Sequence, residues 1–542
     1  MQHTHTKGWT GGSLIISALI ALPMVVVIAS LFSPVDADWA HVWENTLPEY
    51  VSNTLLLMLQ VAVYTTLIGV GTAWLTSATE FPGRRTLSWL LVLPMAAPAY
   101  IVAYIYTDLL DFSGPVQASL RAITGLGGGE YYFPQIRSLP GAALILSLVL
   151  YPYVYLLVRV AFLRRSATLF NSARTLGASP NRAFWQIALP AARPALAGGL
   201  ALVLMETLAD FGVVDYFGVP TFSTGIFRTW FAFGEKAVAM KLAAVMLLLV
   251  LALVLFEKRS RRKIEQQSLA ADYQPQRLVL TTGMGRFVFF LCTLPVLFGA
   301  LIPITVLINY AWTVGDPLWG ARFFDYFGNS MQVALITTLI AVAIALYLTY
   351  AGYLSNNRSN RFSIQIATIG YALPGAMLAV GLLAPVSSVD RWLTGNLEHW
   401  FGWQGGLVLT GTVTVLIYAY VVRFLTVAYN TVSSSLAQIP PIYSHAARTL
   451  GAKPARVAQS IHVPLMTNSI LVAGILVFVD TVRELPATLM LRPFNFETLA
   501  TRVYRLASDE RIAEASTASL LIVLLGLIPV LLLNHLAARQ GR

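Results

Sequence analysis

The sequence predicts an all-α membrane protein with about 12 transmembrane helices, arranged as two parallel six-helix repeats. Its 542 residues are 57% hydrophobic and only 11% charged, whereas soluble proteins contain roughly 25% charged residues. Apolar stretches near the length that crosses a bilayer, about 20 residues, recur along the whole chain. A long segment of the first half also recurs in the second half.

Twelve apolar stretches define the expected helices in order. Those of the first half lie at 13–32, 54–78, 87–110, 139–163, 195–215 and 238–256. Those of the second half lie at 286–311, 330–354, 363–385, 405–429, 468–490 and 515–537. No clear small-residue cleavage site follows the first stretch, so we expect it to be retained as a span.

The distribution of positive charge predicts the orientation. If the N-terminus is cytoplasmic and the spans alternate, most of the 36 Lys and Arg residues fall in cytoplasmic loops. This asymmetry is typical of a multi-pass protein with both termini in the cytoplasm. The net charge of +11 is therefore a topology signal that also favours anionic membrane lipid, and we expect no nucleic-acid partner. The single cysteine, Cys292, excludes an intrachain disulfide and a cysteine-based metal site.

The recurring segment divides the chain. Arg174-Thr-Leu-Gly-Ala-Ser-Pro reappears 274 positions later as Arg448-Thr-Leu-Gly-Ala-Lys-Pro. We expect three parts: a first half with one such loop, a charged cytoplasmic linker, and a second half with the other loop. They cover 1–256 (loop 164–193), 257–285 and 286–542 (loop 436–467). Because six spans restore the orientation, the repeat is parallel and should give a pseudo-twofold axis along the membrane normal, with a pathway between the halves.

Each recurring loop is expected to form a helix, a glycine turn and a second helix. Gly177 can take the left-handed conformation that closes a helix, and Ser179 can cap the helix that follows. That amphipathic helix should end before Pro190. The second copy has Lys453 in place of Ser179, which makes a poorer cap. Ordinary interfacial helices explain one such loop but poorly explain two with matched spacing.

The spacing resembles the cytoplasmic Glu-Ala-Ala loop of the permease subunits of bacterial binding-protein-dependent ABC importers. The matching positions are Asn171, Ala173, Arg174, Gly177, Ile187 and Pro190 in the first copy, and His445, Ala447, Arg448, Gly451, Ile461 and Pro464 in the second. The Glu of the family is replaced by Asn171 and His445, so a salt bridge from that position is not expected. The resemblance implies a type I importer permease in the bacterial inner membrane, whose loops dock on an ATPase and which receives its solute from a periplasmic binding protein.

The chain is not expected to hydrolyse ATP. It contains no Gly-x-x-x-x-Gly-Lys-Ser/Thr phosphate loop, and the dipeptide Gly-Lys never occurs. We therefore expect a separate ATPase that binds ATP and Mg²⁺, and two docking loops imply two copies of it. No catalytic residue and no cofactor are assigned to this chain.

Two pairs of acids fall in or beside expected spans. Glu206 and Asp210 lie four residues apart, on one face of a helix, and Asp480 and Glu484 repeat the pattern. A charge in mid-bilayer costs at least about 2.5 kcal/mol, so such residues suggest function. The four carboxylates are a candidate translocation pathway for a hard cation. The alternative is that they lie near span ends and pair with Arg483 or neighbouring helices; no metal ligand is assigned.

The segments that begin at Glu206 (Glu-Thr-Leu-Ala-Asp-Phe-Gly-Val-Val-Asp-Tyr) and at Glu484 (Glu-Leu-Pro-Ala-Thr-Leu-Met-Leu-Arg-Pro-Phe) are similar to those of fused ferric iron permeases. This resemblance implies that Fe(III) arrives on a periplasmic ferric-binding protein. Alternatives are a permease of the same type for thiamine, an anion or a polyamine. A secondary transporter driven by an ion gradient, or a membrane scaffold, fits the two related halves less well.

Overall fold

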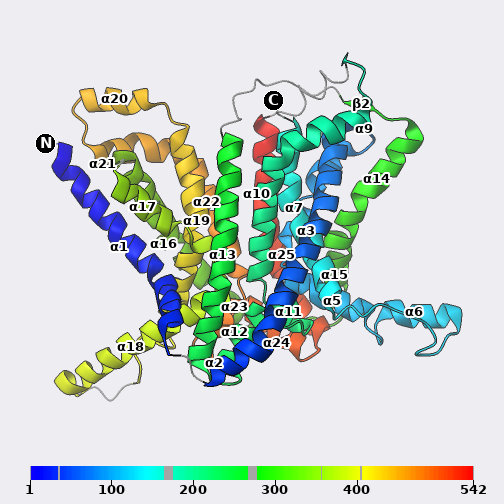
Figure 1. Cartoon of the computed structure of the whole chain (residues 1–542), viewed down its shortest axis with the longest axis horizontal. Helices are drawn as coiled ribbons and strands as arrows, with labels where there is room; N and C mark the ends of the chain where they lie inside the picture. Colours follow the sequence, from blue (N-terminus) through cyan, green and yellow to red (C-terminus); the bar gives the residue numbers. More distant parts are fainter. Residues whose placement is uncertain are drawn as a thin grey trace. The chain divides into compact units, whose positions relative to one another are not determined.

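The computed structural model describes residues 2–34, 37–163, 175–265, 277–355, 357–402 and 406–540, and this part of the chain is almost entirely helical (Figure 1). Two short parallel strands, β1 (Thr79–Glu80) and β2 (Leu278–Val279), are the β-structure within those ranges, and turns and loops make up the rest. Eleven of the described helices are long and apolar enough to cross a membrane. The number is twelve if the bent pair Arg84–Ala96 and Ala99–Thr124, which turns by 90°, forms one span, so the predicted fold class is confirmed.

The described helices pack as two compact units that each contain segments of both sequence halves. Unit 1 comprises 1–39, 226–247 and 318–502, and unit 2 comprises 40–225, 248–317 and 503–542. The first half thus contributes its first span and part of its last span to unit 1, and the second half contributes its first and last spans to unit 2. The linker at 257–285 separates the two copies of the sequence repeat. That it also separates two domains stays a prediction.

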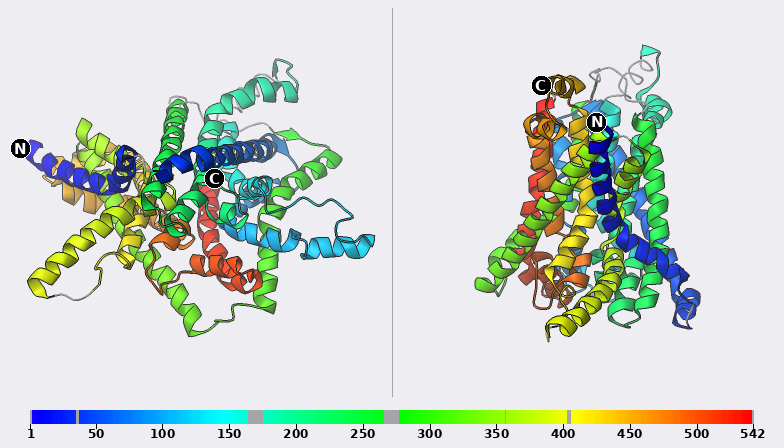
Figure 2. Two further views of the ribbon diagram at one scale, coloured as in Figure 1. Left: turned by 60° about the horizontal axis from the view of Figure 1, so that its bottom comes forward. Right: turned by 90° about the vertical axis from the view of Figure 1, so that its left-hand side faces the viewer.

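Unit 2 is built around α3, α7 and α10, which pack against one another. Its helices are α3 (Leu47–Ala78), α4 (Arg84–Leu90), α5 (Ala99–Leu110), α6 (Pro115–Thr124), α7 (Leu139–Ala161), α9 (Pro180–Ala183), α10 (Leu189–Ala209), α11 (Gly212–Tyr216), α14 (Thr282–Val296), α15 (Ile302–Thr313) and α25 (Ile512–Gln540), with turns η2 (Val42–Thr46), η3 (Leu93–Ala96), η5 (Phe184–Ala188) and η6 (Leu297–Leu301). Helix α6 extends sideways from the rest of the unit (Figures 1 and 2). The spans contributed by the second half pack closely here: a Cβ on Gly526 of α25 would collide with the carbonyl oxygen of Ala96.

Unit 1 repeats this arrangement with α16, α19 and α22. Its helices are α1 (Gln2–Ala29), α16 (Ala321–Leu354), α17 (Arg358–Ala367), α18 (Gly375–Phe401), α19 (Val413–Ala437), α20 (Pro441–Thr449), α21 (Pro454–Val457), α22 (Val463–Val482) and α23 (Pro486–Leu491), with turns η1 (Ser30–Phe32), η7 (Gly370–Ala372) and η8 (Ala458–His462). Four helices cross the boundaries between the units: α2 (Ala37–His41), α12 (Phe222–Phe231), α13 (Lys236–Glu265) and α24 (Leu499–Ser508). Helix α1 is fixed on α17 by polar contacts, because the Ser13 hydroxyl donates to Asn360 Oδ1 (2.5 Å).

The duplication extends to individual hydrogen bonds. In unit 2 the Asn53 side-chain amide donates to the carbonyl oxygen of Pro220 over 3.0 Å. In unit 1 Asn329 donates to the carbonyl oxygen of Glu497, also over 3.0 Å. The two asparagines are 276 positions apart in the sequence, so each repeat closes its own fold with the same contact.

The third expected span of each half is not continuous. Both are interrupted by a proline that lies just before a new helix: Pro98 precedes α5 and Pro374 precedes α18. Proline favours the first turn of a helix but lacks the N–H that would continue the preceding one. Single helices at 87–110 and 363–385 were therefore wrong expectations, although the hydrophobic stretches themselves lie where predicted.

The outer faces of the long helices carry apolar side chains, as a lipid environment requires. Along α3, Leu55, Leu59 and Leu67 are 47%, 61% and 69% exposed, while Leu57 and Val61 between them are buried. The exposed leucines mark the side of α3 that faces hydrocarbon.

Candidate functional site: the paired loops and the helix breaks

The second recurring loop is fully described and has the predicted shape. Helix α20 ends at Thr449, and Gly451 follows with a φ of +84°. The Gly451 N–H donates to the Arg448 carbonyl (3.0 Å) and the Ala452 N–H to the Ala447 carbonyl (3.0 Å). These two bonds form a Schellman motif, which satisfies the last carbonyls of the helix and needs a left-handed residue where Gly451 lies.

The first loop has the same geometry in its described part. Asn171, Ala173 and Arg174 lie outside the described residues. Gly177 has a φ of +87°, and the Ser179 hydroxyl accepts from the Arg182 N–H (3.4 Å) at the start of α9. In the second loop Lys453 makes no side-chain cap at the matching position, as predicted.

One expectation for the loops was wrong: the helix does not end before the proline. Helical structure runs without a break from Pro180 to Ala209 and from Pro454 to Val482. Each copy instead contains a π-helical turn, at Phe184–Ala188 and at Ala458–His462. The following prolines, Pro190 and Pro464, have no N–H and crowd the carbonyl four residues earlier, and the wider turn accommodates both effects.

A leucine is exposed at the tip of each loop. Leu176 and Leu450, which directly precede the two glycines, are each 88% exposed. Large apolar side chains at matched exposed positions are typical of a surface that another protein covers. Of the other sequence-predicted positions, His445 and Arg448 are exposed. Ile187 is partly buried and packs against Ala183, as do Trp74 and Leu278.

The second loop is joined to α16 by a polar network that sequence reasoning missed. The Tyr353 hydroxyl donates to Ser444 of α20 (2.8 Å), and Ser444 is hydrogen-bonded to His462 Nε2 (2.8 Å). The Tyr350 hydroxyl donates to the carbonyl oxygen of Pro454. These hydrogen bonds link the second loop to α16 and η8.

The first loop is joined to unit 2 by aromatic packing instead. Trp74 of α3 lies 4.7 Å from Phe184 and 5.3 Å from Phe162 between ring centroids. Trp74 is the counterpart of Tyr350 at the shift of 276. The two loops thus have one shape but different attachments.

The candidate pathway acids lie where α10 and α22 end. Asp210 follows α10, and its carboxylate accepts from the N–H groups of Val213 and Val214 (both 3.2 Å) at the start of α11. Glu484 follows α22 and accepts in the same way from Ala487 and Thr488 (both 3.0 Å) at the start of α23. Both carboxylates cap a short helix, which is a structural role that sequence spacing did not reveal.

The remaining acids differ between the halves. Glu484 also pairs with Arg423 of α19 (2.8 Å), with 2% and 13% of the two side chains exposed. Asp480 pairs with Arg483 one turn later. Glu206 is half-buried on α10. Among the described residues no three His, Cys, Asp or Glu lie together in a way that would hold a metal ion, and a joint pathway of the four acids stays a prediction.

The duplicated helical fold and its two exposed loops define a multi-span membrane permease.

The family described as "binding-protein-dependent transport system inner membrane component" matches residues 10–265. The Fe(3+)-transport system permease protein FbpB 2 of Haemophilus influenzae is 26% identical over 497 residues, which cover 90% of each chain. The sulfate transport system permease protein CysT of Escherichia coli is 27% identical over 210 residues, 38% of this chain and 71% of the relative. The molybdenum transport system permease protein ModB of H. influenzae is 29% identical over 30% of this chain and 69% of the relative. The first half of the chain thus matches the permease family of binding-protein-dependent importers, and the similarity to the ferric permease extends over both repeats.

Proposed function

We propose that this permease carries ferric iron across the bacterial inner membrane after a periplasmic ferric-binding protein delivers it. The observation that carries the proposal is the extent of the match: the ferric permease aligns over 90% of both chains, and so over both repeats. The sulfate and molybdenum permeases align over 38% and 30% of the chain, less than one repeat. An anion permease of the same type is the second candidate, because these relatives share the fold of one half.

The ATPase partner is proposed to dock on the two loops, with one copy on each. Leu176 and Leu450 are the apolar contacts available at the loop tips, and Gly177 and Gly451 set the direction in which they point. In unit 1 the N-terminal end of α1 lies at the same end as α20, and in unit 2 the C-terminal end of α25 lies at the same end as α9 (Figure 1). Docking on the cytoplasmic side therefore implies that both termini are cytoplasmic.

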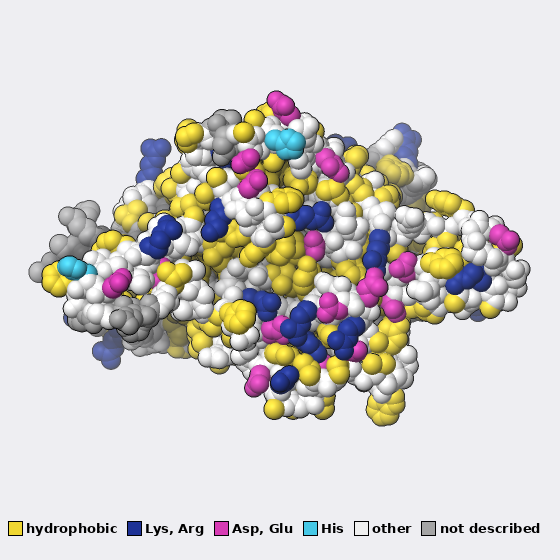
Figure 3. Space-filling model, turned by 90° about the horizontal axis from the view of Figure 1, so that it is seen from below, with side chains coloured by type: hydrophobic (Ala, Val, Ile, Leu, Met, Phe, Trp, Pro, Cys, Tyr) yellow, Lys and Arg dark blue, Asp and Glu magenta, His cyan; other side chains and the backbone are white. Residues whose placement is uncertain are grey.

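The periplasmic partner is proposed to bind at the opposite end. Basic and acidic side chains are interspersed on that face (Figure 3). In unit 2 they include Arg505, Asp509, Glu510 and Arg511, all exposed. Charged surfaces of mixed sign favour a specific orientation of a partner over tight apolar adhesion.

The test is uptake of radioactive iron by proteoliposomes that contain the permease with its ATPase and enclose ATP. We expect uptake that requires the external ferric-binding protein and that stops when the ATPase cannot hydrolyse ATP. Import of radioactive sulfate or molybdate in place of iron would show the anion alternative. Uptake driven by an ion gradient without ATP would show a secondary transporter.

A further inference from the structure

Helices α5 and α11 lie at the end of unit 2 away from α9 (Figure 1) and carry residues of a group of phenol and carboxylate side chains. Tyr104 of α5 and Tyr216 of α11 have ring centroids 4.5 Å apart, with the rings at 68°. The Tyr504 hydroxyl donates to Asp215 Oδ2 over 2.7 Å. Tyr504, Tyr216 and Asp215 all lie close enough to the Tyr104 hydroxyl to interact with it electrostatically. We call these four residues the tyrosine cluster.

Two hydroxyls of the tyrosine cluster have no hydrogen-bond partner in the described part of the chain, those of Tyr104 and Tyr216. Tyr104 is only 2% exposed. A buried hydroxyl without a partner costs roughly 1–3 kcal/mol, and native proteins seldom retain one without a use for it. Tyr216, Asp215 and Tyr504 are half-buried, so the cluster is open on one side.

The repeated half shows that the fold does not need these polar groups. At the matching positions Tyr104 is replaced by Val380, Asp215 by Leu489 and Tyr216 by Met490. Val380 and Met490 are buried. Helix α18 begins after Pro374 as α5 begins after Pro98, and the first N–H groups of α23 bond to a carboxylate as those of α11 do. Tyr504 likewise matches Phe227 in the first copy. The tyrosine cluster is thus confined to one side of a duplicated fold.

We propose that the tyrosine cluster is a transient binding site for the ferric ion on its way through the permease. Phenolate and carboxylate oxygens are hard ligands that suit a hard cation, and tyrosinate is an established protein ligand of iron(III). The site rests on the proposed cargo and deepens it. The site contains one carboxylate, that of Asp215, and takes its other oxygen ligands from tyrosines. It therefore does not depend on three acidic residues lying together.

Binding requires that the phenols lose their protons. Each phenol that coordinates iron breaks its O–H bond, releases the proton to water and forms an Fe–O bond, and iron stays in the ferric state. The guanidinium of Arg137 lies 5.0 Å from the centre of the Tyr216 ring.

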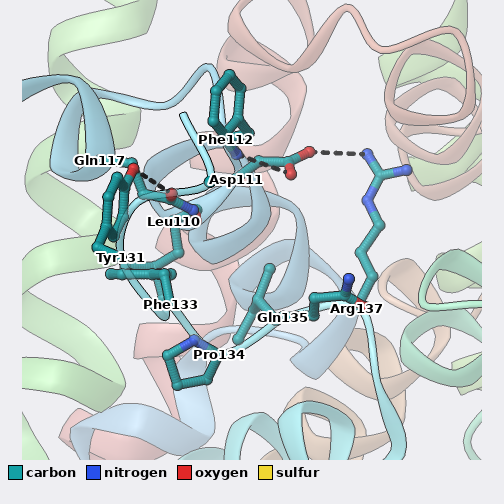
Figure 4. Close-up of a pocket in the computed structure, with 11 residues that line it drawn as sticks. Leu110, Asp111, Phe112, Gln117, Tyr131, Phe133, Pro134, Gln135 and Arg137 are labelled. Carbon is teal, nitrogen blue, oxygen red and sulfur yellow. Dashed lines mark hydrogen bonds and ion pairs between the residues drawn. The ribbon is translucent and has the colours of Figure 1, made fainter. Parts of the chain in front are cut away.

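Arg137 also connects the tyrosine cluster with a pocket of about 380 Å³. Asp111, Gln117, Tyr131 and Arg137 are among the residues that line the pocket, and the Arg137 side chain reaches toward the Asp111 carboxylate (3.9 Å; Figure 4). The same guanidinium lies 3.5 Å from Glu510. Arg137 is thus the residue that the pocket lining and the surroundings of the tyrosine cluster share.

The first test measures iron binding to the purified full-length permease, with ferric nitrilotriacetate as the probe. We expect a visible phenolate-to-iron charge-transfer band and tyrosinate modes in resonance Raman spectra. The band should be lost in the variant that combines Tyr104→Phe, Tyr216→Phe and Tyr504→Phe. Tyr106→Phe is the matched control: it lies on the same helix, and its hydroxyl donates to the Phe298 carbonyl, outside the cluster. An equal band in the wild type and the triple variant, or no band in either, would overturn the proposal.

The second test measures ferric uptake by the same variants with the ATPase and binding protein present. We expect the triple variant to lose at least about tenfold in uptake, the range seen even for the outer partners of metal ligands, with normal folding and ATPase docking. Normal uptake by the triple variant would overturn the binding site and leave the proposed cargo intact. Failure of the wild type to import iron would instead overturn the proposed cargo, and the site with it.

Discussion

At the scale of single residues, the two exposed leucines are the clearest link between sequence and partner. Leu176 and Leu450 occupy the same position in both loops and contribute little to folding, because each is 88% exposed. Their apolar surface is removed from water only when a partner covers it. A change at these positions should therefore affect association and not stability.

We expect Leu176→Glu and Leu450→Glu each to weaken binding of the ATPase. Loss of a contact at the centre of an interface costs about 2 kcal/mol, or roughly 30-fold in Kd. Surface plasmon resonance with the permease in nanodiscs measures the change, and the double variant should abolish binding. Ile123→Glu is the control. Ile123 is 84% exposed, close to the 88% of the two leucines, and it lies on α6, which belongs to neither loop. Equal ATPase binding by the double variant and the wild type would contradict the docking role of the loops.

The ion pair between Arg423 and Glu484 leads to a stability prediction. We expect Arg423→Leu to lower the free energy of unfolding by about 3–5 kcal/mol, because it leaves a buried carboxylate without its counter-charge. Thermal unfolding in detergent, followed by size-exclusion chromatography, measures the loss.

Two comparisons make this prediction specific. Adding Glu484→Gln to Arg423→Leu should restore part of the stability, because no unpaired charge then remains and the amide oxygen still accepts from the start of α23. Arg483→Gln should cost less, since the Asp480–Arg483 pair is more exposed, at 16% and 27%. Additive losses in the double variant would show that the pair is not coupled.

The sequence predicted some of these residues and not others, for physical reasons. The left-handed conformation of the two glycines could be predicted from the local sequence. A glycine directly after a helix commonly takes this conformation and closes the helix. The acids were recognised by their cost in a membrane, but their partners were not. Arg423 lies 61 positions from Glu484, and the caps on α11 and α23 depend on where the spans break, which hydrophobicity alone does not determine.

At the scale of elements, each loop is a rigid turn attached to its unit by a few side chains. In each loop the helix after the glycine continues into the following span through a π-helical turn, at Phe184–Ala188 or Ala458–His462. We therefore expect a movement at the loop to displace α10 or α22 as well. Sequence reasoning expected a break at the prolines, because a wide turn that absorbs a proline has no clear signature in a single sequence.

Gly451 tests this rigidity. We expect Gly451→Ala to cost about 1–2 kcal/mol in the loop, because an L-residue is strained at a φ of +84°. A Cβ there would meet no atom within 4 Å, so the effect comes from the backbone alone. The ratio of iron imported to ATP hydrolysed should fall while the spans stay folded.

Gly451→Asn separates strain from other causes, because asparagine tolerates the left-handed conformation and should recover most of the transport ratio. Gly474→Ala is the matched control within α22, where a Cβ would make only an ordinary contact of 3.5 Å with Thr338. If Ala and Asn at position 451 behaved alike, the left-handed turn would not be what couples the loop to the spans.

At the scale of the whole molecule, each compact unit needs both halves of the chain. Helix α1 packs on α17 and α18 of the second half, and the segment α14–α15 packs on η3, α5 and α7 of the first half. The repeat itself and the number of spans were readable from the sequence. The exchange of end spans was not, because similar apolar faces fit either set of middle helices and only close contacts decide between them.

This exchange predicts how the chain behaves when it is divided. We expect fragments 1–265 and 277–542, produced together, to assemble into a permease that binds the ATPase, since the covalent linker is not needed to form either unit. Produced alone, each fragment exposes faces that α1, α25 or their counterparts normally cover, and proteases should remove it. Immunoblots of membranes and fluorescence-detected gel filtration measure the two outcomes.

The control is the intact chain with a protease site in the linker, which should stay assembled after cleavage. Stable, monodisperse accumulation of either fragment alone would mean that each half folds as its own unit and that the exchanged spans contribute little to stability.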